Sequence, residues 1–162
     1  MSKILDPILE QKMDVIAEEI FGTESDPNQI PITQESGEKL DNLTSHWIKY
    51  KLDERGDPIA WVVVIPTTRE LAKQFVDGDI TEKDLLNLTK AQSAYSALYL
   101  CAAITLPAHR RKGLALQLFK EAIESISKTE DYILVAWPVR VGGAELAEMV
   151  AQKVGHEILI RE

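Results

Sequence analysis

Residues 97–115 read ALYLCAAITLPAHRRKGLA, and this stretch decides the fold. Its first part is almost entirely apolar and contains aromatic and β-branched side chains, while Pro107 limits its length. Periodicity alone would also allow a helix, but these features favour a buried strand over 97–106. After a short basic loop, apolar residues recur at helical spacing over 113–127. The stretch therefore predicts a strand, a tight loop and an amphipathic helix that begins at a glycine.

Outward from this unit, the apolar pattern predicts further strands and helices on both sides. Turn residues over 53–57 separate two β-rich runs and predict an antiparallel hairpin. Thr81, followed three residues later by Asp84, resembles a capped helix start. The other predicted strands are 46–52, 58–66, 133–137 and 156–160, and the other predicted helices are 6–21, 36–43, 70–76, 82–88 and 144–153.

The composition is that of a globular chain. A length of 162 residues with 45% hydrophobic and 27% charged residues predicts a single domain over 1–162. Cys101 is the only cysteine, so no intrachain disulfide forms, and no Cys/His spacing matches a zinc site. The N-terminus lacks the pattern of a secretory signal, and the longest apolar stretch, 94–107, is shorter than the roughly 20 residues that span a bilayer. We expect a cytoplasmic protein without a metal and without a membrane contact.

The charge distribution narrows the class of ligand. A formal net charge of -8 disfavours nucleic acid and anionic membranes, because binding to both depends on an excess of Lys and Arg. Arg110, Arg111 and Lys112 stand out against this background, since the rest of the chain carries -11 (-8 minus 3). A cationic island of this size suits a small polyanion.

The loop 107–112 and the glycine after it carry the chemistry. Backbone N–H groups at a helix N-terminus have no acceptor within the helix, and the helix dipole adds partial positive charge there, so such a corner can hold a pyrophosphate. Gly113 keeps a side chain out of the way, and Arg110 and Lys112 can add charged contacts. From these few residues alone, a solvated charge run beside a turn glycine explains the pattern equally well.

The wider context favours the first interpretation. Residues 105–115, TLPAHRRKGLA, resemble the acetyl-CoA signature of the GNAT superfamily of N-acetyltransferases, in which Arg110, Gly113 and Ala115 fill the three defining positions. The order of predicted elements over 46–160 is similar to the core of that family. The resemblance implies an α/β (α+β) fold, with a mixed, mostly antiparallel central sheet flanked by helices and a shortened C-terminus.

The resemblance also implies ligand contacts and an activity. Acetyl-CoA would be the co-substrate, its pantetheine arm pairing with the strand backbone and its pyrophosphate held by the loop amides. The residues implied are Ala103, Ile104, Thr105, Arg110, Arg111, Lys112, Gly113, Leu114, Ala115 and Leu116. The implied reaction is direct transfer of an acetyl group to a primary amine of a small molecule or peptide, with a backbone N–H near Ala103 stabilising the oxyanion.

The candidate catalytic residue is Tyr99, at a position where some family members place a carboxylate base. A tyrosine that packs in the core with its hydroxyl satisfied is the alternative. Cys101 lies on the same face two residues later, where a buried cysteine is usually a small hydrophobe. Glu145 and Glu148, on a later helix that faces the presumed thioester end, could deprotonate an amine through water, although charged residues on a solvated helix face are the commoner case.

Departures from the family pattern keep other functions open. Ala151 and Ala144 stand where many members carry a tyrosine acid and an asparagine, and neither can do that chemistry. A catalytically weak CoA-binding sensor or partner-binding module of the same fold is therefore the second hypothesis. An interaction protein without a ligand is the third, and a homodimer in which two chains complete each other's sheets is left open.

Overall fold

The computed structural model describes residues 5–21, 34–138 and 142–162, and it confirms every predicted element to within two residues. The helices are α1 (Pro7–Phe21), α2 (Gln34–Leu43), α3 (Arg69–Val76), α4 (Glu82–Leu88), α5 (Leu114–Ile126) and α6 (Gly143–Val154). The strands are β1 (Ile48–Leu52), β2 (Pro58–Thr67), β3 (Ala97–Thr105), β4 (Ile133–Ala136) and β5 (Ile158–Ile160).

The five strands form one open mixed sheet in the order β1-β2-β3-β4-β5. β1, β2 and β3 pair antiparallel, and these are the longer pairings, whereas β3, β4 and β5 pair parallel. A parallel neighbour requires a crossover connection, and α5 and α6 supply the two that the sheet needs. The mixed α/β class expected from the sequence is confirmed.

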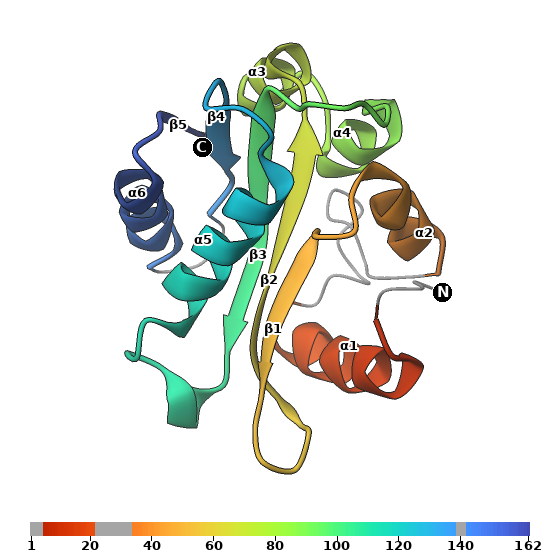
Figure 1. Ribbon diagram of the computed structural model, residues 1–162, viewed down its shortest axis with the longest axis vertical. Helices are drawn as coiled ribbons and strands as arrows, with labels where there is room; N and C mark the ends of the chain where they lie inside the picture. Colours follow the sequence, from red (N-terminus) through yellow and green to blue (C-terminus); the bar gives the residue numbers. More distant parts are fainter. Residues whose placement is uncertain (1–4, 22–33, 139–141) are drawn as a thin grey trace.

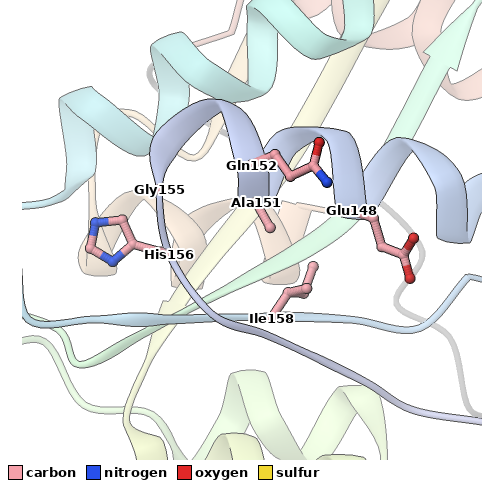
Figure 2. A pocket seen from close by; sticks show the side chains of 6 residues that line it. All are labelled: Glu148, Ala151, Gln152, Gly155, His156 and Ile158. Atoms are coloured by element: carbon pink, nitrogen blue, oxygen red, sulfur yellow. The ribbon is translucent and has the colours of Figure 1, made fainter.

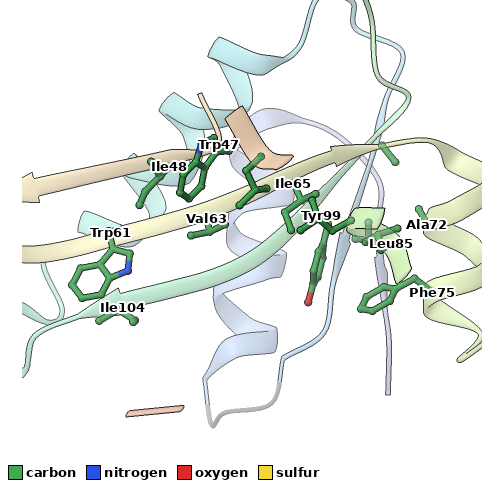
Figure 3. Close-up of a cluster of buried hydrophobic side chains, with 14 of the residues drawn as sticks. Trp47, Ile48, Trp61, Val63, Ile65, Ala72, Phe75, Leu85, Tyr99 and Ile104 are labelled. Atoms are coloured by element: carbon green, nitrogen blue, oxygen red, sulfur yellow. The ribbon is translucent and has the colours of Figure 1, made fainter. Parts of the chain in front are cut away.

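Helices cover both faces of the sheet. In Figure 1, α5 and α6 lie on one side and α1 to α4 on the other. Each side has its own core, because side chains alternate between the two faces of a strand. On the α1–α4 side the core includes Leu9, Leu40, Phe75 and Leu85 from the helices, and Figure 3 shows part of it around Tyr99. On the α5–α6 side it includes Leu118, Phe119, Ile123 and Val150.

The segment between β2 and β3 carries α3 and α4 across one end of the sheet. The N–H of Thr81 donates to Asp84 Oδ2 at 2.9 Å, and the N–H of Asp84 donates to Thr81 Oγ1 at 3.1 Å. This reciprocal pair is a capping box, as the spacing of the two residues predicts. It fixes the start of α4 at Glu82.

Candidate functional site

β3 contains a bulge that changes which way its side chains face. Val63 of β2 lies opposite Ala102, and the next residue, Val64, lies opposite Leu100, so Cys101 is an extra residue without its own partner on β2. As a result, Tyr99 and Ile104 pack on the same α1–α4 side, although an even number of residues lies between them and a regular strand would direct them to opposite faces. The sequence gives no signal for this bulge, because the apolar run 97–106 has no polar side to fix its register.

The sheet opens on the β4 side of β3 at the same place. The pairing between β3 and β4 ends at Leu100 and Ala136, and in Figure 1 β3 continues well past the end of β4. Within the part of the chain that the structure describes, residues 102–105 pair with β2 alone. Backbone N–H and C=O groups along this half of β3 are therefore available to an extended ligand.

Two residues direct their backbone groups to this open edge. The N–H of Leu106 donates to the carbonyl of Ile59 on β2 at 2.9 Å. Because backbone groups of successive strand residues point to opposite edges, Ala103 and Thr105 point away from β2. The carbonyl of Thr105 accepts a hydrogen bond from Arg110 Nε at 2.9 Å, which agrees with that direction. The N–H of Ala103 thus faces the opening, as the predicted oxyanion contact requires.

The loop after β3 begins with a 3-10 turn over Pro107–His109 and then reverses direction in a left-handed conformation. Arg111 has φ 65°, which is uncommon for a residue with a side chain, and Gly113 has φ 74°. A Cβ on Gly113 would meet no atom within 4 Å, so the space beside it is open. The loop therefore leaves room for a ligand directly at the start of α5.

The start of α5 has donors without helical partners. Gly113 is its N-cap residue and provides no side-chain hydrogen bond. The first N–H groups of any helix lack an acceptor one turn earlier, so those of Leu114, Ala115 and Leu116 point out of the helix end. The side chains of Arg110, Arg111 and Lys112 are exposed around this point. Donors and cations gather where the sequence predicts a phosphate site.

The structure thus brings the predicted acetyl-CoA residues into one continuous strip. The open edge at Ala103–Thr105 leads without interruption into the loop, and the loop leads into α5. We call residues 101–116 the strand–loop strip. Arg110 also braces it, because its side chain folds back onto the end of β3 instead of pointing only into solvent.

Tyr99 does not lie on the strip's open edge. Its side chain is 1% exposed, its ring contacts Phe75 at 4.9 Å between centroids, and its hydroxyl donates to Glu82 Oε2 at 2.5 Å. Figure 3 shows this hydroxyl pointing away from the sheet. Burial first, and then the charges of Cys101 and Glu82, raise the pKa of Tyr99 well above its usual range. Tyr99 is therefore a buried hydrogen-bond donor, and its catalytic role stays a prediction.

Two charged residues near Tyr99 were not predicted from the sequence. Glu82 is 5% exposed although it begins a helix, and Arg161 places its guanidinium 4.7 Å from the ring centre of Phe75 and 4.5 Å from that of Trp137. In the sequence, Glu82 is an ordinary acidic residue in a first helical turn. Its burial depends on how α4 packs against the sheet, which no local pattern reveals.

A second concave feature lies between α6 and β5. This open cleft of about 450 Å³ is lined by Glu148, Ala151, Gln152, Gly155, His156 and Ile158. Figure 2 shows Glu148 and His156 at its opposite ends. The imidazole of His156 stacks on Tyr132 at 3.7 Å, and its Nδ1 lies 3.0 Å from the Tyr132 carbonyl oxygen. None of the residues predicted to bind acetyl-CoA lines this cleft.

No helix within 5–21, 34–138 and 142–162 has the length and apolar character needed to cross a membrane. In the same ranges, no three His, Cys, Asp or Glu side chains are grouped so as to hold a metal ion. Known proteins add no assignment to this geometry: no protein-family model matches the chain, and no curated protein is significantly similar to it.

Proposed function

We propose that the chain is a GNAT-type N-acyltransferase that binds acetyl-CoA along the strand–loop strip and transfers the acetyl group to a primary amine. The observation that carries this proposal is the continuity of the strip. An open strand edge leads directly into a loop with exposed cations and unsatisfied helix N–H groups. A ligand that fits both parts needs an extended arm with amide groups and an anionic end.

CoA has this combination of groups. The two amides of its pantetheine arm can pair with the backbone of Ala103 and Thr105, much as an added strand pairs with a sheet edge. Its pyrophosphate suits the first N–H groups of α5 and the charges of Arg111 and Lys112. With the pyrophosphate at the loop, the arm runs along β3 toward Cys101, so the thioester end lies near the bulge.

The backbone near Ala103 accounts for part of the chemistry. When the amine attacks the thioester carbon, the carbonyl oxygen gains negative charge, and a fixed N–H donor stabilises that charge. Holding thioester and amine in attack geometry supplies a further part of the rate increase. The leaving thiol has a pKa of about 8.5, so its thiolate departs at neutral pH without a dedicated acid. The alanine at position 151 is compatible with this route.

A CoA-binding sensor without turnover is the second candidate. The observation that favours it is the position of Tyr99, whose hydroxyl is engaged with Glu82 inside the core. In that case the strip would bind the ligand while no side chain served the acceptor.

Two measurements on the full chain distinguish these functions. Titration calorimetry with acetyl-CoA tests ligand binding, and release of free CoA in the presence of ethylamine, a polyamine and a lysine-containing peptide tests transfer. Binding with amine-dependent CoA release is the expected result. Binding without release favours the sensor, and absence of binding contradicts both functions.

A further inference from the structure

A buried carboxylate lies beneath the point where the sheet opens. The carboxylate of Glu82 accepts the hydroxyl proton of Tyr99 at 2.5 Å, and the thiol of Cys101 also hydrogen-bonds to it. We call these three residues the Glu82 cluster. It joins α4 to two residues of β3, the next element along the chain. A carboxylate in an apolar core is costly unless such partners compensate for lost water.

The position of Glu82 is not explained by the start of its helix. The capping box of α4 is complete without it, because Thr81 and Asp84 satisfy each other's backbone N–H groups. A glutamate in the first turn would normally reach solvent. Here the side chain is 5% exposed and turns toward β3 instead.

The cluster coincides with the branch point of the strand–loop strip. Tyr99 lies one residue before the end of the pairing between β3 and β4. Cys101, the bulge residue, is the first residue of β3 after that pairing. Cys101 is partly buried, and its position after the pairing places the cluster at the end of the open edge. In the proposed complex the thioester lies at the same end of the edge.

The protonation of the cluster leaves one group able to accept a proton. Burial first, and then Glu82, raise the pKa of the Cys101 thiol well above its usual range, and the pKa of Tyr99 is raised in the same direction. Both residues therefore keep their protons at neutral pH and act as donors. The hydroxyl of Tyr99 donates to Glu82 Oε2, so the carboxylate is the acceptor of the cluster. The positive charge of Arg161 also acts on the cluster, where it lowers the pKa of Tyr99 against these larger effects.

We propose that Glu82 is the proton acceptor of the acyl transfer and that Tyr99 and Cys101 are positioning residues that hold its carboxylate. This inference rests on the proposed function. An amine that has lost its first proton to solvent forms the N–C bond to the thioester carbonyl, and its remaining excess proton passes to Glu82, directly or through one water. The C–S bond then breaks, and the departing thiolate takes the proton, which restores the carboxylate.

The assignment changes the role expected for Tyr99. Its hydroxyl proton points at Glu82, so it neither accepts a proton from the amine nor donates one to the thiolate while that bond is present. Its contribution is to set the orientation and the proton affinity of the carboxylate. A core tyrosine without this role would leave the pH dependence of turnover unchanged.

The test compares Glu82→Gln, Tyr99→Phe and Glu70→Gln in the full chain, with acetyl-CoA and the amine that the wild-type protein acetylates fastest among ethylamine, a polyamine and a lysine peptide. Glu70 is an exposed carboxylate in the first turn of α3 and provides the matched control. We expect Glu82→Gln to lower kcat about 100-fold or more, the usual contribution of a general base, with the Kd for acetyl-CoA within threefold of the wild-type value. Glu70→Gln should retain wild-type kcat.

The pH profile provides a second readout, which also serves if Glu82→Gln does not fold. Removing a donor from a carboxylate raises its pKa, so Tyr99→Phe should move the acidic limb of the kcat profile to higher pH. Unchanged turnover in Glu82→Gln, or an unchanged limb in Tyr99→Phe, would overturn the assignment while acyl transfer stands. A wild-type protein that binds no acetyl-CoA, or acetylates no amine, would instead overturn the proposed function and this inference with it.

Discussion

At the scale of single residues, Gly113 offers the sharpest test of the phosphate site. It adopts a left-handed conformation with open space where a Cβ would lie. We predict that Gly113→Glu keeps the fold and abolishes CoA binding, because a carboxylate would occupy the position of the pyrophosphate. Calorimetry with CoA measures the loss.

Two control variants separate charge from backbone strain. Gly113→Ala carries the same strain, roughly 1 kcal/mol, without a charge, and should retain most of the affinity. Gly78→Glu places the same charge at φ 85° in an open site away from the loop, and should bind CoA normally. Near-wild-type affinity in Gly113→Glu would contradict the assignment of the loop to phosphate.

Arg110 combines a structural contact with an exposed charge. Its Nε donates to the Thr105 carbonyl, which places the guanidinium beside the loop. Arg110→Ala should weaken CoA binding by on the order of 1 to 3 kcal/mol, the range of a charged hydrogen bond, and added salt should reduce the difference. Lys128→Ala removes an exposed cation elsewhere and should leave the Kd unchanged. If both variants weakened CoA binding equally, Arg110 would act only as part of the general surface charge.

Glu10 reports on stability and not on function. It is 8% exposed, and its Oε2 has no hydrogen-bond partner among the described residues. Burial, with a contribution from the charge of Asp41, raises the pKa of Glu10 above 4.5. The folded protein then holds a proton that the unfolded chain releases, so the stability from this group is present below about pH 4.5 and is lost as pH rises through the folded-state pKa.

We therefore predict that Glu10→Gln stabilises the protein at pH 7. The gain should be on the order of 1 kcal/mol in the free energy of unfolding, because the variant removes a largely buried charge whose Oε2 has no hydrogen-bond partner among the described residues. Denaturant unfolding at pH 7 and pH 4 measures it, and the gain should disappear at pH 4. Glu148→Gln, an exposed carboxylate, provides the control. A gain of equal size at both pH values would show that protonation of Glu10 is not the cause.

At the scale of elements, β3 has two roles, because it is a core strand and, in the proposed complex, one wall of the ligand site. Its bulge separates these two functions. Before the bulge, β3 pairs on both edges, and after it the β4 side is open among the described residues. A substitution on the open side should therefore affect the ligand more than the fold.

Proline substitution tests this difference directly. Ala103 directs its N–H to the open edge, so Ala103→Pro removes no hydrogen bond to β2, whereas Ile104→Pro removes one. We expect Ala103→Pro to fold and to lower kcat by roughly 100- to 1,000-fold, the loss found when one oxyanion donor is removed. Ile104→Pro should unfold the chain or lower its Tm strongly. Full turnover in a folded Ala103→Pro protein would contradict the role of this N–H.

The sequence predicts the elements well because each has a local signal. Thr81 and Asp84 mark a helix start by their own hydrogen bonds, and the glycine at 113 marks another by its conformation. Non-local features had no such signal. The bulge at Cys101 depends on pairing with β2, and the burial of Glu82 depends on packing between α4 and β3.

At the scale of the whole molecule, the two sides of the sheet have different roles in the proposed complex. The loop and α5 lie on one side, where the anionic end of CoA would bind, and the Glu82 cluster lies on the α1–α4 side. The opening between β3 and β4 connects them. Arg110, Arg111 and Lys112 at the loop are positively charged, whereas the whole chain has a net charge of -8. An anionic ligand is therefore attracted to the loop and repelled by most of the remaining surface.

Backbone amide NMR of the full chain, with and without acetyl-CoA, reports directly whether CoA lies along the strand–loop strip. We expect the amides of Ala103, Thr105 and 111–116 to show the largest shift changes and to gain protection from hydrogen exchange. The amides around Glu148 and His156 in the α6–β5 cleft should change little. Absence of any change with acetyl-CoA, or changes confined to that cleft, would show that CoA does not bind along the strip.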